Sequence, residues 1–247
     1  MAQTGRQTGF WPARSRRRNV AASEQHSISA MIVSPRRNFI FAHIPKTGGT
    51  AMALALEARA MADDLMLGDT PKARRRGRWD ALPPAQGRLW KHSSLADIAG
   101  AVPDDLIAAA LRVTLVRNPW DRVVSYYHWL RVQRFPHPQV DLAKSTDFAG
   151  FVTHPSTRSA LAALPARHYL TDATGSEGRA LYIRLEHFAD DAKPFFDHLG
   201  FQFDLPRANA SERAADWRGY YHAASVDAVA QACVEDIARF GYRFDPD

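Results

Sequence analysis

The clearest chemical signal in this sequence is a lysine and a glycine pair between two apolar segments. The run Phe39–Ile44 predicts a buried strand, and the alanine- and leucine-rich stretch that follows predicts a helix. The residues between them are Pro45, Lys46, Thr47, Gly48, Gly49 and Thr50. Glycines at a strand-to-helix turn let backbone N–H groups approach an anion, and the helix N-terminus and the lysine add positive charge. We therefore predict a loop that binds an anionic, phosphate-bearing ligand.

A nucleotide-hydrolysing P-loop is an alternative interpretation of this loop. That motif needs a glycine four residues before a Gly-Lys-Ser/Thr triplet. Lys46-Thr47 imitates the end of the triplet, but Pro45 stands in the place of its glycine and no second glycine lies upstream. An ordinary strand-to-helix turn would also explain a bare glycine pair, whereas the lysine and Thr50 favour anion binding. A P-loop kinase stays open as an alternative that magnesium-dependent ATP turnover would support.

A second strand, turn and helix carries an arginine and a serine. The segment 111–116 predicts a strand, and Asn118, followed by a proline, predicts the start of a helix that ends near Arg131. Arg117 then projects from the carboxyl end of the strand. Ser125 lies about two turns into the helix, where its hydroxyl could join Arg117 on one phosphate group. A guanidinium and a hydroxyl together suit a terminal phosphate.

These two segments together resemble the sulfotransferases that use 3′-phosphoadenosine 5′-phosphosulfate (PAPS). In that family a loop like residues 45–50 grips the 5′-phosphosulfate, and a segment like residues 117–125 grips the 3′-phosphate. The resemblance extends from about Ile32 to Phe244 and is closest to the carbohydrate sulfotransferases that include the heparan sulfate 2-O- and 6-O-enzymes. It implies that PAPS is the co-substrate, that the loop with Lys46 and the pair Arg117 and Ser125 bind it, and that the acceptor is a hydroxyl of a carbohydrate or glycolipid.

Sulfuryl transfer to an alcohol needs a base for the hydroxyl proton and positive charge at the departing oxygen. Lys46 is expected to stabilise that oxygen. The segment 89–92 predicts a short strand that ends at His92, followed by a helix capped by Ser93 or Ser94. His92 is the expected base, because a histidine is a workable base near neutral pH and the 2-O- and 6-O-enzymes resemble this chain in using one at a corresponding place.

The alternative for His92 is a purely structural histidine. The His-x-His of some relatives is absent, since Ser94 replaces the second histidine. His43 is expected to pack or to cap rather than to react, and Lys91 is a weaker candidate for contact with sulfate. The reaction requires no metal, and no pair of histidines has the spacing and carboxylate support of a metal site.

The segment 180–185 predicts a third strand, followed by a helix that ends near Leu199-Gly200. Three strands with flanking helices predict a three-layer α/β sandwich around a mainly parallel sheet, a P-loop-like sulfotransferase fold. Glu186, at the end of the third strand, is expected to make a structural contact with a basic residue of the site. Further on, Ser225 and Gly241 are expected to bound a helix whose apolar stripe includes Cys233, a core residue.

The composition, with 46% hydrophobic and 23% charged residues in 247, fits one domain, which we place at residues 31–247. Residues 1–30 are rich in arginine and predict a disordered basic extension; a transit peptide and a polyanion-binding arm are alternatives, and Met31 is an alternative start. One cysteine excludes an intramolecular disulfide and fits the cytoplasm. No apolar run is long enough for a transmembrane segment.

A formal charge of +6 suits binding of an anionic nucleotide donor and acceptor. A non-catalytic protein that binds polyanions or nucleic acid is therefore another alternative, although no specific nucleic-acid partner is expected. The weakly structured stretch 68–87 contains the basic cluster Arg74–Arg78, which predicts either a charged surface loop or a loop that contacts the acceptor. The segment Asn209–Arg213 resembles a loop that could close over the nucleotide.

Overall fold

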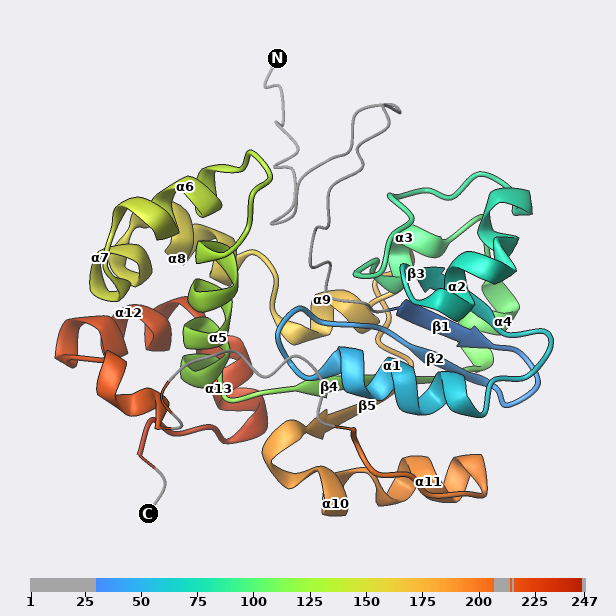
Figure 1. The fold of residues 1–247 in the computed structure, drawn as a ribbon. Helices are drawn as coiled ribbons and strands as arrows, with labels where there is room; N and C mark the ends of the chain where they lie inside the picture. Colours follow the sequence, from blue (N-terminus) through green and yellow to red (C-terminus); the bar gives the residue numbers. More distant parts are fainter. Residues whose placement is uncertain (1–29, 207–213, 215, 246–247) are drawn as a thin grey trace.

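A five-stranded sheet forms the centre of the part of the chain that the computed structural model describes, residues 30–206, 214 and 216–245 (Figure 1). In spatial order the strands are β3 Leu65–Gly68, β1 Ala30–Ser34, β2 Phe39–Phe41, β4 Leu111–Val116 and β5 Arg179–Arg184. β2, β4 and β5 pair in parallel, whereas β1 pairs antiparallel with both β2 and β3. All of these strands except β1 therefore point the same way, which confirms the predicted α/β fold with a mainly parallel sheet.

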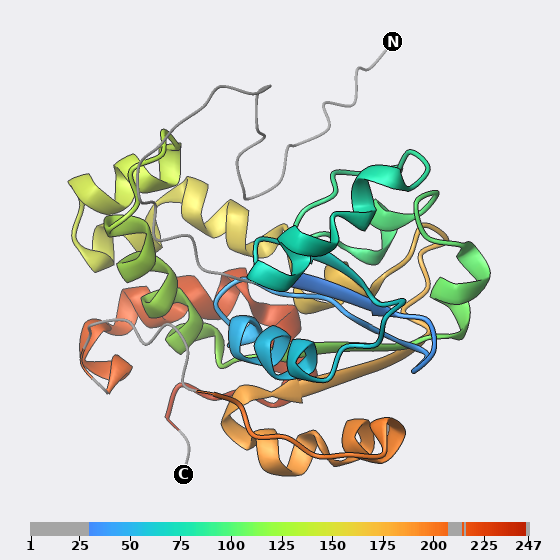
Figure 2. The same ribbon diagram turned by 45° about the vertical axis from the view of Figure 1, so that its right-hand side comes forward.

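Helices cover both faces of the sheet and make it the middle of three layers (Figures 1 and 2). On one face lie α1 Gly49–Ala58, α10 Phe188–Asp191 and α11 Lys193–Leu199; on the other lie α3 Leu95–Ile98, α4 Asp104–Ala109 and α9 Ala166–Leu170. Phe39 and Phe41 pack in the first core and Ile40 in the second, as the alternation along a strand requires. Because both faces are buried, the strand is apolar without interruption.

A third group of helices surrounds a separate core to one side of the sheet (Figure 1). The group consists of α5 Pro119–Arg131, α6 Pro138–Ser145, α7 Phe148–Thr153, α8 Pro155–Ala162, η3 Trp217–Tyr220, α12 Ala223–Ala232 and α13 Val234–Phe240. Aromatic contacts dominate this core: the Tyr127 ring lies 5.2 Å from that of Phe151, and the Phe148 ring 4.8 Å from that of Tyr221. α5 follows β4 directly, so this group stands next to the carboxyl end of the sheet.

The strongest predictions from sequence match the structure closely. β4 and α5 have the predicted bounds, and the Asn118 side chain caps α5 by accepting a hydrogen bond from the Trp120 N–H at 3.1 Å. β5 is displaced from its predicted bounds by one residue, and α11 ends at Leu199 with Gly200 in the left-handed region. Ser94 caps α3, as one of the two serines was expected to do.

Other predictions from sequence were wrong. The segment 89–92 is a turn rather than a strand, because the Ser93 N–H donates to the Trp90 carbonyl and the Ser93 hydroxyl accepts from the Trp90 N–H. The stretch 68–87 contains α2 Pro71–Arg76, capped by Thr70, and the 3₁₀ turn η1 Arg78–Ala81. β1 and β3 were not predicted, because such short apolar runs do not distinguish strand from helix.

The C-terminal helix also differs from its prediction. His222, rather than Ser225, is the N-cap, and the Ser225 hydroxyl accepts from the His222 N–H at 2.9 Å. The chain leaves helical geometry at Cys233, which divides the predicted helix into α12 and α13 before Gly241 ends it. Cys233 is buried in the third core, as expected.

Two predictions concern residues that the structure does not describe. The basic N-terminal extension lies outside the described residues except for Ala30, which begins β1, one residue before the predicted domain start. The segment 209–213 also lies outside the described residues.

Arg112, near the start of β4, is a buried cation that connects β4 to two helices and a loop. Its guanidinium donates to the carbonyls of Ile107 (3.2 and 3.3 Å), Leu170 (3.2 Å) and Ser176 (2.6 Å), and to the Asp172 carboxylate at 2.6 Å. Only 1% of the Arg112 side chain is exposed. Removing one partner of such a pair leaves the other partner buried and uncompensated.

We expect Arg112→Met to destabilise the fold by about 3–5 kcal/mol, which for a chain of this size lowers Tm by roughly 10 °C. Calorimetric or circular dichroism melting measures this. Arg36→Met is the matched control, because the Arg36 side chain is 69% exposed and its ion pair with Asp63 is on the surface. A melting temperature of Arg112→Met equal to that of Arg36→Met would contradict the structural role of the cluster.

Candidate active site

The loop that follows β2 has the geometry of an anion cradle. Residues 45–48 form turns, and α1 begins at Gly49. Lys46 has φ +66°, a left-handed conformation that is uncommon for a residue with a side chain, and Gly48 has φ +88°. The Thr47 hydroxyl donates to the Ile44 carbonyl at 2.9 Å and thus stabilises the turn from inside. The turn and helix are the ones that the sequence predicted, whereas the strand is shorter, because β2 ends at Phe41 rather than at Ile44.

Both glycines of the loop are required by their surroundings. A Cβ on Gly48 would lie 2.9 Å from the Leu185 side chain, and a Cβ on Gly49 would lie 1.9 Å from the His43 ring. Gly48 is the N-cap of α1 and has no side chain, so no side-chain oxygen caps the helix. The first N–H groups of this ten-residue helix therefore have no side-chain cap, which fits an anionic ligand at the helix N-terminus.

Arg117 joins this loop to the second predicted segment. Its Nε and Nη2 donate to the Asp121 carboxylate at 2.8 and 2.6 Å, and its Nη1 donates to the Lys46 carbonyl at 3.2 Å. These bonds engage three of the five N–H groups of a guanidinium, which leaves two donors for a ligand. The structure thus brings Arg117 and the lysine loop together, as expected, in a fixed orientation.

A second arginine, Arg122 on α5, also contacts the loop. Its Nε donates to the Pro45 carbonyl at 3.0 Å. Arg122 belongs to the segment that resembles the 3′-phosphate motif, but no role was predicted for it. Its position one turn after Asn118, on the same helix as Ser125, was the available signal.

Two further predicted ligands, Ser125 and Thr50, are buried. Ser125 lies on the buried side of α5 and is 5% exposed, and Thr50 is buried in the first turn of α1. The contacts of Arg117 are with Asp121 and Lys46. A phosphate shared by Arg117 and Ser125 therefore stays a prediction.

His92 is buried beside the lysine loop, in contact with two other rings. Its ring centroid is 4.5 Å from that of His43 and 5.0 Å from that of Trp90. Its Nδ1 lies 2.8 Å from the His43 carbonyl oxygen. Because a carbonyl can only accept, Nδ1 carries the proton, and in the neutral ring Nε2 has the lone pair that a base needs.

The electrostatic environment keeps both histidines neutral. Burial lowers the pKa of His92 to about 3, and the positive charges of Lys91 and Lys46 act in the same direction. Burial, His92 and the same two lysines hold the pKa of His43 well below its usual value. Lys91 itself donates to Asp69 at 2.9 Å. The predicted base and the predicted lysine are therefore close enough to interact.

Glu186 connects the end of β5 to the turn after Arg117. Its carboxylate accepts from the Asn118 N–H at 2.6 Å and from the Tyr242 hydroxyl at 3.2 Å. The expected structural role is observed, but the partner is the backbone amide next to Arg117 rather than a basic side chain.

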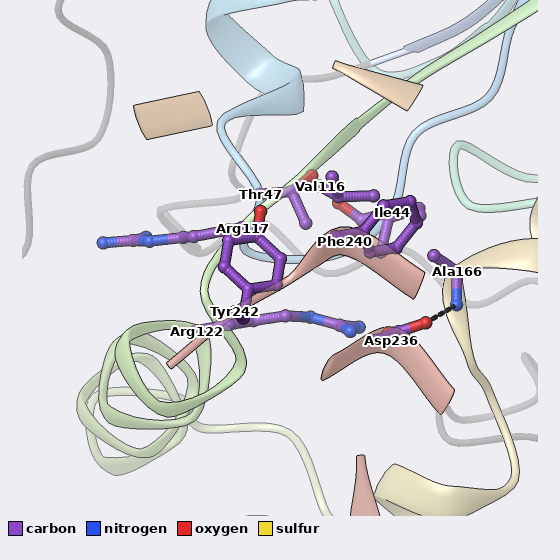
Figure 3. Close-up of a pocket in the computed structure, with 9 residues that line it drawn as sticks. All are labelled: Ile44, Thr47, Val116, Arg117, Arg122, Ala166, Asp236, Phe240 and Tyr242. Carbon is purple, nitrogen blue, oxygen red and sulfur yellow. Dashed lines mark hydrogen bonds between the residues drawn. The ribbon is translucent and has the colours of Figure 1, made fainter. Parts of the chain in front are cut away.

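A small cavity of about 10 Å³ lies behind the loop, between β2, β4, α5 and α13 (Figure 3). Its lining residues are Ile44, Thr47, Val116, Arg117, Arg122, Ala166, Asp236, Phe240 and Tyr242. In Figure 3 the Arg122 side chain extends from α5 toward Asp236 on α13, and the Asp236 carboxylate accepts from the Ala166 N–H at 2.8 Å. Asp236 and Tyr242 were not predicted as part of the site.

A family model and a solved structure match this chain. A family model described as the sulfotransferase family matches residues 29–169, more than half of the chain. Among solved structures, the chain is similar to mouse sulfotransferase SULT7A1 complexed with PAP, at 13% identity and a TM-score of 0.41, over 83% of this chain and 85% of that one. No curated protein sequence matches the chain.

Two features are absent from the residues that the structure describes. No helix there has both the length and the apolar character needed to cross a membrane. No group of three or more His, Cys, Asp or Glu residues there could hold a metal ion.

Proposed function

Because the chain belongs to the sulfotransferase family, we propose that it transfers a sulfuryl group from PAPS to a hydroxyl of a saccharide acceptor. The observation that carries this proposal is the hydrogen bond from Arg117 to the Lys46 carbonyl. This hydrogen bond places the Arg117 guanidinium next to the loop that contains Lys46 and the N-terminus of α1. One ligand with two anionic ends could therefore contact the loop with one end and Arg117 with the other.

The described residues fit such a donor. The glycine cradle and the N-terminus of α1 suit the 5′-phosphosulfate, and Lys46 adds a positive charge beside them. The two remaining N–H donors of Arg117, with Ser125, would hold the 3′-phosphate. When bound, PAPS supplies a sulfuryl group activated by its link to phosphate, and its transfer to the acceptor oxygen leaves 3′-phosphoadenosine 5′-phosphate (PAP).

His92 and Lys46 perform the two remaining tasks, proton removal and charge stabilisation. His92 takes the proton of the acceptor hydroxyl at Nε2, because its Nδ1–H is held by the His43 carbonyl. Lys46 stabilises the negative charge that develops on the departing oxygen. His92 and Thr47 are themselves almost fully buried.

The proposal is tested by incubating the protein with PAPS and a panel of saccharides, glycolipids and phenols, and by identifying sulfate esters by mass spectrometry. We expect sulfated saccharide together with release of PAP, in the absence of added metal. Sulfation of phenols alone would contradict the saccharide acceptor. Magnesium-dependent ATP turnover without sulfation would instead support a kinase.

Arg117→Ala is expected to weaken PAP binding about tenfold or more, because a charge-assisted contact contributes roughly 1.5–3 kcal/mol. ADP lacks a 3′-phosphate and should lose less affinity, the residual loss reflecting the missing contact with the Lys46 carbonyl. Titration calorimetry with both nucleotides measures the difference.

Arg134→Ala is the control for this measurement, because Arg134 is an exposed arginine just beyond α5. It should bind both nucleotides like the wild type. Equal losses of PAP and ADP affinity in Arg117→Ala would remove Arg117 from the 3′-phosphate site and leave it only a role in the loop.

A further inference from the structure

Lys46 adopts a backbone conformation that its own residue type disfavours. A left-handed φ of +66° in a residue with a Cβ costs on the order of 1–3 kcal/mol and persists only where neighbours maintain it. The carbonyls on both sides of the Lys46 α-carbon are held by arginines: Arg122 contacts that of Pro45, and Arg117 contacts that of Lys46. The direction of the lysine side chain therefore depends on contacts from Arg117, just before α5, and from Arg122 on α5.

Arg122 differs from Arg117 in the direction of its charged end. The Arg117 side chain points away from the cavity in Figure 3, whereas that of Arg122 extends across it toward Asp236. Arg122 lines the cavity behind the loop together with Thr47.

Asp236 is the acidic group that faces Arg122 across the cavity. Burial raises the pKa of Asp236, while the hydrogen bond from Ala166 and the charge of Arg122 lower it. The other titratable groups close enough to sense Arg122 are Tyr126 on α5, Tyr169 on α9, Cys233 before α13, and His92. The cavity has room for about one water molecule, enough for a bridge between the guanidinium and the carboxylate.

We infer that Arg122 is a positioning residue that holds Lys46 in its left-handed conformation through the Pro45 carbonyl, and that Asp236 holds Arg122 in turn. This inference rests on the proposed function for its kinetic consequence. Arg122 thus acts on the loop rather than on the nucleotide. Loss of the Arg122 side chain should therefore affect turnover more than PAP binding.

The test combines Arg122→Met with Lys46→Ala. Arg122→Met should lower turnover at saturating PAPS by about tenfold to a hundredfold, as expected for misplacement of a catalytic group, with PAP affinity within about threefold of wild type. In the Lys46→Ala background the same substitution should cause no further loss, because the residue through which it acts is gone. A full additional loss in the double variant, or a loss of PAP affinity as large as that of turnover, would overturn the inference.

A second measurement requires no sulfuryl transfer. Hydrogen exchange of peptides covering residues 44–50 should be faster in Arg122→Met than in wild type, while exchange around Arg112 stays unchanged. Unchanged exchange in the loop would overturn the inference even if turnover fell. Accelerated exchange in a protein that sulfates nothing would support the positioning role and refute the proposed function.

Asp236→Asn tests the outer part of the arrangement, because an amide oxygen can still accept from the Ala166 N–H while the negative charge is lost. We expect a severalfold loss of turnover that is not additive with that of Arg122→Met. Arg122→Lys keeps a cation and a donor, and should retain more activity than Arg122→Met. Arg131→Met, at the exposed end of the same helix, should behave like wild type. Additive losses from Asp236→Asn and Arg122→Met would show that Asp236 does not act through Arg122.

Discussion

Replacing Lys46 by alanine is expected to lower turnover by roughly 10²–10³ while PAP affinity falls much less. The reason is that the ammonium stabilises charge on the departing oxygen, and this charge is fully developed only as the bond to sulfur breaks. In the proposed mechanism PAP binding depends mainly on the helix N-terminus and Arg117, which the substitution leaves in place. Steady-state turnover at saturating PAPS and calorimetric titration with PAP measure the two effects separately.

The backbone of the loop makes alanine the appropriate substitution. Alanine carries a Cβ, so it keeps the same left-handed strain at φ +66° and leaves the conformational balance of the loop unchanged, whereas glycine would relieve it. Lys144→Ala, on the exposed face of α6, removes a lysine far from the cradle and serves as the control. Near-normal turnover of Lys46→Ala would exclude the proposed role of Lys46, and so would a parallel loss of PAP affinity.

The sequence predicted the two strand, turn and helix segments of this candidate site because their signals are local. A strand, a glycine turn and a helix are specified by consecutive residues, and so are the Asn118 cap and the proline that begins α5. Both predicted segments have these elements in the structure, and Arg117 meets the lysine loop. The family assignment, which depends on the same two segments, is confirmed.

The contacts behind the loop were not predictable, because they join residues far apart in the sequence. Arg122 reaches Pro45 across 77 residues, and Asp236 reaches Ala166 across 70. Neither carboxylates nor arginines on amphipathic helices reveal their partners through spacing alone. The left-handed conformation of Lys46 was equally hidden, since sequence assigns such a φ to glycine first.

The surroundings of His92 show a different limit. The sequence predicted a histidine next to the site, at the end of a strand. In the structure His92 lies instead in a turn that hydrogen bonds between Ser93 and Trp90 stabilise. The sequence also predicted a pKa of His92 close to neutrality, which the structure corrects. Burial against Trp90 and His43, which no local pattern encodes, is the main cause of the difference.

His92→Ala is expected to cut turnover by roughly 10², the low end of the contribution of a positioned base, because an imidazole with a pKa of about 3 is a weak base, with PAP affinity close to wild type. The affinity should persist because the donor is held by the loop and Arg117. His92→Gln is the better-packed companion variant, since its amide can still donate to the His43 carbonyl. Both variants should be similarly slow, because neither can accept the proton.

The pH dependence follows from the lowered pKa of His92. A base must be neutral, so activity is lost as pH falls through its pKa; at about 3 this lies far below neutrality, and turnover should show no His92 limb between pH 6 and 8. An anion bound beside Lys46 offsets one of the charges that lower the pKa of His92. The titration of His92, followed by NMR, should therefore move to higher pH when PAP is added.

The pH dependence of folding stability provides an independent check that His92 is buried and neutral. His92 and His43 have pKa values below those of the unfolded chain, so the unfolded state binds more protons once pH falls below about 6.5. The contribution of these residues to stability is therefore present above that pH and lost as pH falls toward their folded-state values. Melting temperature should fall less steeply between pH 6.5 and 4 in His92→Gln than in wild type.

If His92→Gln keeps wild-type turnover, the base lies elsewhere. If its melting curve has the wild-type pH dependence, His92 is not the buried neutral imidazole that the mechanism needs.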